Sequence, residues 1–316
     1  RESPTPSQIT EARKTWTIDL TPGTHTIQVK SKTDRSDEGL SEEIRITYTA
    51  PAPKRPSLFL LAIGISTYRG QPAPLQYAHT DAAAIASTLD THSHDLFETV
   101  DCRVLSNELA TRDAILGGLE WLHRQVEQAA GENRESIAVI FYSGHGMNDS
   151  GNHFYLVPVD ADPEQPAETC VSGSALRDFC AKTRRCKLVV LLDACHSGGI
   201  NLSRFFSVTE SVEHITRELG RNDFGVIMMA SSCGNETSLE LNEIQAGAFT
   251  KALVESLEGQ ADDDRDGLVL IPVEAYSHTR RRVLELTQRQ QTPINSNTGV
   301  MDFAITKVAD PAVAKR

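Results

Sequence analysis

Continuous apolar runs alternate with amphipathic segments through most of the chain. Unbroken apolar runs are typical of strands that are covered on both faces, so each run predicts a central strand. The predicted strands are residues 58–65, 137–142, 188–192 and 224–230. Helical periodicity predicts helices at 81–89, 111–130, 175–182, 247–257 and 272–286, with Thr80 and Thr111 as N-caps of the first two. This alternation predicts a mainly parallel α/β sheet of about six strands between helices.

A different pattern precedes the first apolar run. Residues 15–20, 25–30 and 43–49 alternate between polar and apolar side chains around Gly-containing turns, which predicts a short β-meander. Three short strands are too few for an independent sandwich, so we expect the end of a truncated β-sandwich domain. The predicted domains are a tail with these strands (1–50), a Pro-rich linker (51–56), the α/β domain (57–306) and a tail (307–316).

Composition narrows the class of protein. The chain of 316 residues has 43 acidic against 31 basic side chains and a formal charge of -12, which disfavours nucleic acid as a partner. No apolar run is long enough to span a bilayer, and no signal-peptide pattern is present, so we expect a cytoplasmic protein without a membrane partner. The six cysteines show neither zinc-site spacing nor a disulfide framework, which favours a reducing compartment.

Two predicted strands end in small, glycine-rich loops that carry reactive side chains. Residues 137–142 lead into His145, and residues 188–192 lead into Cys195. Parallel neighbours would place both residues at the same edge of the sheet. A thiolate is a competent nucleophile, and an adjacent imidazole can take its proton and return one to a leaving amine. The backbone N–H groups of Gly146 and Cys195 are the candidate oxyanion donors.

The interval between His145 and Cys195 is 50 residues, which is the spacing of caspase-type peptidases. The sequences Phe-Tyr-Ser-Gly-His-Gly at 141–146 and Leu-Asp-Ala-Cys-His-Ser-Gly at 192–198 resemble the two catalytic blocks of that family, and most of all its metacaspase and bacterial orthocaspase branch. Further segments resemble blocks of this branch in the same order, and they are residues 58–66 with Tyr68, 75–89, 154–160, 230–238 and 247–250. The resemblance implies a caspase-like α/β/α sandwich and a cysteine endopeptidase.

The resemblance also implies a specificity. In metacaspases an acid two residues before the cysteine, here Asp193, and one in the first helix, here Asp81, form a pocket for Arg or Lys. Ser231, in the block 230–238, is expected to bind substrate as well. Paired carboxylates suit a desolvated guanidinium. The arginine that holds aspartate in true caspases aligns with Leu75, so we expect protein or peptide substrates with Arg or Lys at the cleavage site.

Other readings of single residues compete with these roles. Asp81 alone could be a helix N-terminal acid, and Asp193 a loop acid that accepts backbone N–H groups. His196 is expected to be structural, because His145 is the better-placed partner of the thiol. Ser143 lacks the G-x-S-x-G elbow of a serine nucleophile.

No cofactor is expected to be required, although one segment matches part of a calcium loop. Asp262, Asp264, Asp266 and Gly267 occupy positions 1, 3, 5 and 6 of an EF-hand-like loop, but Glu274 comes one place late. A solvated acidic turn is the alternative. Metacaspases often use a separate calcium site after the histidine block, to which Asp160 and Asp162 could contribute, but further acids are missing near Ser172.

The preferred interpretation is therefore a bacterial Arg/Lys-specific cysteine endopeptidase, the effector end of a larger protein with a sensor domain or partner upstream of residue 1. Basic residues in the polar stretch 200–223 offer sites for self-cleavage, and they are Arg204, Arg217 and Arg221. The alternative from another class is a catalytically silent caspase-like module that binds partners.

Overall fold

The computed structural model describes residues 14–32, 37–49, 54–69, 74–149, 151, 153–162, 164–195, 226–231, 238–297 and 301–308. Contacts divide the chain into two compact units, residues 1–53 and 54–316. The boundary falls inside the stretch 51–56 that the sequence predicted as a linker. None of the helices in the described ranges combines the length and the apolar character that crossing a bilayer requires.

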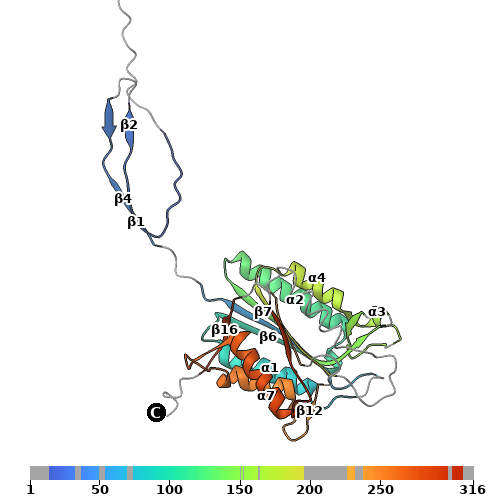
Figure 1. Cartoon of the computed structure of the whole chain (residues 1–316). Coiled ribbons are helices and arrows are strands. Elements are labelled where there is room, and N and C mark those ends of the chain that lie inside the picture. The colour runs from blue at the N-terminus through green and yellow to red at the C-terminus, as the bar shows by residue number, and fades with distance from the viewer. Residues whose placement is uncertain are drawn as a thin grey trace, which may run out of the picture. The chain divides into compact units, whose positions relative to one another are not determined.

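The first unit contains a two-stranded ribbon (Figure 1). Strand β1 (Gly23–Ile27) pairs antiparallel with β4 (Ile44–Tyr48), and β2 (Lys30–Lys32) pairs with β3 (Glu38–Leu40). The predicted meander is wrong in one respect, because residues 15–20 form no strand. Trp16 and Ile18 alternate with polar residues there, but both are more than half exposed, so no apolar side chain in the described part of the chain covers the segment.

The second unit is built on a mixed sheet whose central strands are parallel. The described residues place eight strands in it, six of them in one row with the order β15-β11-β10-β7-β5-β6, while β8 and β9 extend from β7. The strands are β5 (Ser57–Gly64), β6 (Thr99–Ser106), β7 (Ser136–Asn148), β8 (Phe154–Leu156), β9 (Val171–Ser172), β10 (Lys187–Cys195), β11 (Val226–Ala230) and β15 (Ile294–Asn297). Only β15 is antiparallel in the row described. The predicted fold is confirmed.

Helices cover both faces of this sheet (Figure 1). Helices α2 (Arg112–Gly131) and α4 (Gly173–Lys182) pack on one face, and α1 (Ala78–Ser93), α6 (Ala248–Glu255) and α7 (Val273–Leu286) pack on the other. Shorter elements connect them: η1 (Asn107–Leu109), α3 (Pro166–Thr169), β12 (Glu240–Leu241), β13 (Ala246–Gly247), the π-helix η2 (Ser256–Gln260), β14 (Leu268–Ile271) and β16 (Phe303–Lys307).

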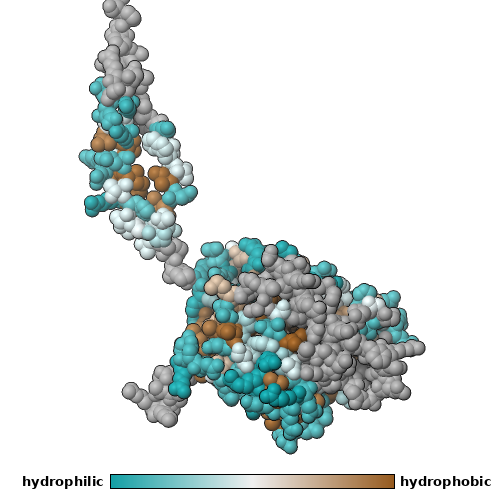
Figure 2. Space-filling view, viewed as in Figure 1, coloured by the Kyte–Doolittle hydropathy of each residue, from teal (hydrophilic) through white to brown (hydrophobic). Residues whose placement is uncertain are grey.

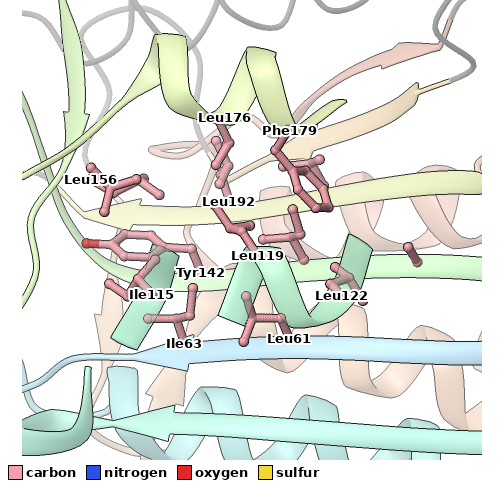
Figure 3. Close-up of a cluster of buried hydrophobic side chains, with 14 of the residues drawn as sticks. Leu61, Ile63, Ile115, Leu119, Leu122, Tyr142, Leu156, Leu176, Phe179 and Leu192 are labelled. Atoms are coloured by element: carbon pink, nitrogen blue, oxygen red, sulfur yellow. The ribbon is translucent and has the colours of Figure 1, made fainter. Parts of the chain in front are cut away.

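The core explains why the central strands are apolar on both faces. Even-numbered positions of β7 and β10 meet α2 and α4, where Tyr142 and Leu192 pack against Leu119 and Leu176 (Figure 3). Odd-numbered positions, such as Phe141 and Leu191, meet α1 and α6. Side chains at even-numbered and odd-numbered positions are therefore both buried. A polar side chain in these strands is costly unless a hydrogen-bond partner satisfies it.

One predicted helix start needs correction. Thr111 is the N-cap of α2, and its hydroxyl accepts from the N–H of Ala114 at 3.2 Å. Thr80, the other predicted cap, lies inside α1, which begins at Ala78, and its hydroxyl donates to the Tyr77 carbonyl at 2.7 Å. The N–H groups of Gln76 and Tyr77 donate instead to the Glu240 carboxylate, at 2.8 Å and 2.9 Å. A residue far along the chain thus replaces the local cap.

Candidate active site

The two candidate catalytic residues lie opposite each other on neighbouring strands. The sequence predicted a glycine-rich loop around His145, but β7 continues through this residue to Asn148, where β8 pairs with it. Strands β7 and β10 run parallel and in register from Ile137 and Lys187 up to the pair formed by His145 and Cys195. Adjacent strands lie about 4.8 Å apart. The backbone therefore places the two residues at neighbouring positions on the carboxyl edge of the sheet, as the sequence predicted.

Tyr68 fixes the histidine on one side. Its ring lies 4.9 Å from the His145 ring, centre to centre, at 35°, and its hydroxyl accepts from the His145 N–H at 2.8 Å. The His145 carbonyl accepts from the Val157 N–H at 3.0 Å and from the Tyr142 hydroxyl. A Cβ on Gly144 would lie 2.7 Å from the Tyr142 hydroxyl oxygen. Position 144 therefore has no room for a side chain. His145 is 3% exposed, and both its backbone N–H and its carbonyl are hydrogen-bonded.

The backbone direction of Gly146 bears on its predicted oxyanion role. Backbone groups of successive strand residues point to opposite sides of the strand. The Ser143 carbonyl accepts from Ile65, which follows β5, and the His145 N–H donates to Tyr68 on the same side. The N–H of Gly146 therefore points to the other side of β7, the side of β10 and of the Cys195 position. The Gly146 N–H thus faces the backbone of Cys195, the residue that the sequence predicts as the nucleophile.

The two predicted specificity acids come together on the face covered by α1 and α6. Asp81 lies in the first turn of α1 and Asp193 near the end of β10, and both are buried, at 3% and 1% exposed. The N–H of Gly247 donates to both Asp81 oxygens, at 3.3 Å and 3.2 Å, and the Thr250 hydroxyl donates to Asp193 Oδ2 at 2.8 Å. Each carboxylate thus meets the first turn of α6.

Hydroxyl groups from neighbouring strands complete the pocket. Ser143 hydrogen-bonds to Asp81, and Ser231 and Ser238 hydrogen-bond to Asp193. Ser231 comes directly after β11, and its N–H donates to the Leu192 carbonyl at 2.9 Å. The structure therefore places Ser231, predicted to bind substrate, beside one of the acids. The buried Ser143 hydroxyl is directed to Asp81, which removes the reason to consider it as a nucleophile.

Burial makes this pocket hold protons tightly. Burial, and after it the charge of Asp193, raises the pKa of Asp81 to about 8, and the charge of Glu240 adds to the shift. Burial also raises the pKa of Asp193 to about 6, although hydrogen bonds from Thr250 and Ser231 oppose the shift. Near neutral pH the pair therefore retains a proton that a bound cation could displace.

Four cysteines have described side chains, and all four are poor nucleophiles. Burial raises the pKa of Cys170 to about 11 and the pKa of Cys102, Cys180 and Cys186 to about 12. Their thiols stay protonated at neutral pH, so they lack the thiolate that attack requires. His196, residues 200–223 and Cys233 lie outside the described residues.

The acidic segment after α6 brings three carboxylates together. Oxygens of Asp262, Asp264 and Glu274 lie within 4.8 Å of one another, although Glu274 comes one place late for an EF-hand-like loop. Backbone N–H groups of Asp266 and Gly267 donate to Asp262. These carboxylates could coordinate a calcium ion. The same hydrogen bonds are equally typical of an acidic turn that needs no ion.

Asp160 and Asp162, the other calcium candidates, serve local turns. Asp160 accepts from the Arg112 N–H at 3.0 Å at the start of α2. Asp162 accepts from the Glu164 N–H at 3.0 Å and from the Gln165 side chain at 2.8 Å. Among the described residues, the carboxylates that gather as a metal site would are those of the 262–274 segment.

Most of the second unit corresponds to a known family. A family model of the caspase domain matches residues 58–303. The chain belongs to the caspase domain family. This makes it a caspase-like cysteine peptidase with protein substrates. Caspase-1 from Spodoptera frugiperda is a similar solved structure, with a TM-score of 0.47 and 12% identity, covering 81% of this chain and 91% of that chain. No curated protein sequence matches the chain.

Two contacts in this caspase domain escaped the sequence reasoning. Tyr68 lies in a segment noted for its resemblance, but nothing in its local pattern indicated a contact with His145 77 residues later. Glu240 follows a polar segment, and its role in capping α1 depends on a contact between distant parts of the chain. Both depend on tertiary contacts that hydrophobic periodicity does not encode.

Replacing Tyr68 by Phe should slow catalysis while the caspase domain stays folded. The ring contact with His145 remains, but the hydroxyl that accepts the His145 N–H is lost, so we expect kcat to fall about tenfold, the equivalent of about 1.4 kcal/mol. The pH profile of Cys195 alkylation by iodoacetamide should also shift, because the backbone that carries the imidazole loses the hydrogen bond from its N–H. Tyr276→Phe, which removes a hydroxyl that donates to Pro293 at 3.0 Å, is the control. Identical kcat and pH profiles in Tyr68→Phe and wild type would refute this role.

Replacing Asp81 by Asn should stabilise the caspase domain at high pH. Its folded pKa of about 8 is raised, so the wild-type stability is fully present below about pH 4 and is lost as the pH rises through about 8. We expect Asp81→Asn to raise Tm at pH 9 by about 3 °C, or about 1 kcal/mol, and the gain to shrink toward pH 5. Differential scanning calorimetry at both pH values measures it. Asp90→Asn, on the same helix with a side chain 61% exposed, should show no such gain. A lower Tm for Asp81→Asn at pH 9 would contradict the argument.

Proposed function

We propose that this chain is a cysteine endopeptidase that cuts after Arg or Lys, with Cys195 as nucleophile and His145 as general base and acid. The observation that carries the proposal is a buried pair of carboxylates beside the strand position of the nucleophile. Asp193 lies two residues before Cys195 on β10, and Asp81 shares its pocket. A buried like-charged pair of this kind is costly unless a cation joins it.

The chemistry follows from the neighbouring positions of His145 on β7 and Cys195 on β10. His145 takes the proton of the Cys195 thiol, and the thiolate attacks the carbonyl carbon of the scissile bond. The N–H groups of Gly146 and Cys195 stabilise the resulting oxyanion. His145 then gives its proton to the leaving amine, and a thioester acyl-enzyme forms. Water, deprotonated by His145, attacks the thioester carbonyl, and the C–S bond breaks to release the new carboxyl terminus. His145 then gives the proton it took from water to the Cys195 thiolate.

Charge in the pocket supports the choice of substrate. A guanidinium or ammonium group that enters between Asp81 and Asp193 replaces their shared proton and pairs with both carboxylates. An aspartate side chain would bring a further negative charge into the same buried space. Leu75, where the resemblance places the arginine of true caspases, offers no positive charge to hold such an acid. We therefore assign the chain to the metacaspase and orthocaspase branch.

The exposed apolar face of the ribbon supports a regulated assembly. Register places Ile27 opposite Ile44, and His25 opposite Ile46, on one face of β1 and β4, whereas threonines dominate the other face. Ile44 is 58% exposed, and apolar side chains line the ribbon in Figure 2. A lone two-stranded ribbon is marginally stable in water. We infer that this face packs on another β-sheet domain that controls the peptidase.

Amide hydrogen exchange tests the inference about the ribbon. Residues 23–27 and 44–48 of the chain alone should exchange within seconds, because they lack an apolar partner, whereas β7 should be protected. The double substitution Ile44→Thr and Ile46→Thr should leave the Tm of the peptidase and its activity unchanged. Strong protection of the ribbon, or a lower Tm in the double variant, would mean that the ribbon already has its partner within this chain.

Fluorogenic peptides test the activity and its specificity together. Wild type should cleave after Arg at least about 100-fold faster, in kcat/KM, than after citrulline, which has the same shape without the charge, a difference of about 2.7 kcal/mol. Peptides with aspartate at this position should stay uncut. Cys195→Ala should abolish turnover, whereas Cys180→Ala, a change of a buried inert thiol, should retain it. Equal behaviour of wild type and Cys195→Ala would favour the silent interaction module, and equal rates on Arg and citrulline would refute the specificity.

A further inference from the structure

Gly247 lies where the two carboxylates of the acidic pocket approach each other. It ends β13 and is the N-cap of α6. A Cβ at this position would lie 2.8 Å from Asp193 Oδ2 and 2.9 Å from Asp81 Oδ2, closer than real Cβ atoms come to other atoms. One oxygen of each acid therefore points at the same small volume beside the glycine. Any larger residue would fill this volume or push the carboxylates apart.

The backbone of Gly247 does not itself demand glycine. Its φ of -64° and ψ of 139° are open to every residue type. The requirement for glycine is therefore one of space, and the space belongs to the acids. This separates Gly247 from turn glycines such as Gly259, whose φ of 110° favours glycine for conformational reasons.

The first turn of α6 also sets where the two carboxylates stand. The Gly247 N–H donates to Asp81, and the hydroxyl and N–H of Thr250 donate to Asp193. Both acids are thus anchored on one rigid element, which is also the positive end of a helix. The distance between the carboxylates depends on this turn as much as on α1 and β10, which carry them.

We propose that Gly247 is a specificity-determining residue, whose missing side chain leaves the gap between Asp81 and Asp193 wide enough for the head group of the substrate's Arg side chain. This rests on the proposed function, which it deepens. A guanidinium is planar and binds as a fork, whereas an ammonium is a compact point charge. A methyl group at position 247 therefore excludes Arg more strongly than Lys.

Steady-state kinetics of Gly247→Ala on matched peptides ending in Arg or Lys tests the proposal. We expect kcat/KM to fall at least about 100-fold for Arg and about tenfold for Lys, so that the Arg-to-Lys ratio falls about tenfold or more. The rate of Cys195 alkylation by iodoacetamide should stay within about twofold of wild type, because the dyad is untouched. Gly117→Ala is the matched control, since a Cβ at that position in α2 would meet no atom within 4 Å outside the backbone of its own helix.

The outcomes separate this inference from the proposed function. If wild type shows no preference for Arg or Lys, the proposed function fails first. If wild type has the preference and Gly247→Ala keeps the wild-type Arg-to-Lys ratio, the proposed function stands and the role of Gly247 is refuted. A fall in both rates by the same factor, with an unchanged ratio, refutes it equally.

A second pair of variants covers the case in which Gly247→Ala does not fold. Thr250→Val keeps the shape of the side chain but removes the donor to Asp193 Oδ2, the oxygen that flanks the gap. We expect its Arg-to-Lys ratio to change about threefold or more, and Thr250→Ser to restore the wild-type ratio because it returns the hydroxyl. An unchanged ratio in Thr250→Val would overturn the claim that the first turn of α6 sets the gap.

Discussion

Two carboxylates that face each other away from water are the constraint around which this edge of the sheet is built. Repulsion between like charges grows as the surroundings become less polar, so the pair persists only with protons or donors at hand. Asp81 and Asp193 receive hydrogen bonds from four directions: the first turn of α6, Ser143 within β7, the residue after β11 and the loop that carries Ser238. The pocket therefore forms only when the helices and strands that meet here are packed in their native positions.

Local pattern predicted the sheet because burial on both faces leaves a simple trace in the sequence. Residues 58–65 and 137–142 are apolar at both parities since α2 packs on one side and α1 on the other. The same reasoning misplaced a strand at 15–20, where Trp16 and Ile18 alternate as in a half-buried strand but have no layer to be buried against. Alternation shows what a segment could bury, and a strand also needs a partner.

The site was predictable to the extent that its reactive residues follow the apolar runs of the central strands. His145, Cys195 and Asp193 lie within three residues of the ends of the apolar runs 137–142 and 188–192, so their shared edge could be inferred from topology before any coordinates. Gly247 could not be recognised in this way, because its φ is ordinary and its importance lies in the oxygens of two acids brought from elsewhere. Thr80 failed as a cap for the same reason, since Glu240 supplies from a distant segment what the local sequence seemed to offer. Hydrophobic periodicity along the sequence carries no information about contacts between segments that are far apart in the chain.

The register of β7 with β10 links recognition to catalysis. Asp193 pairs with Ser143, and two residues later Cys195 pairs with His145. Two residues along a strand advance about 6.6 Å, which is about the length of an extended Lys or Arg side chain. In the proposed function, a substrate whose charged head reaches the acids therefore has its carbonyl near the nucleophile position, whereas a short side chain that reached the acids would hold its carbonyl away from it. Because the strand spacing is fixed by the sheet, length and charge are selected by the same pair of strands.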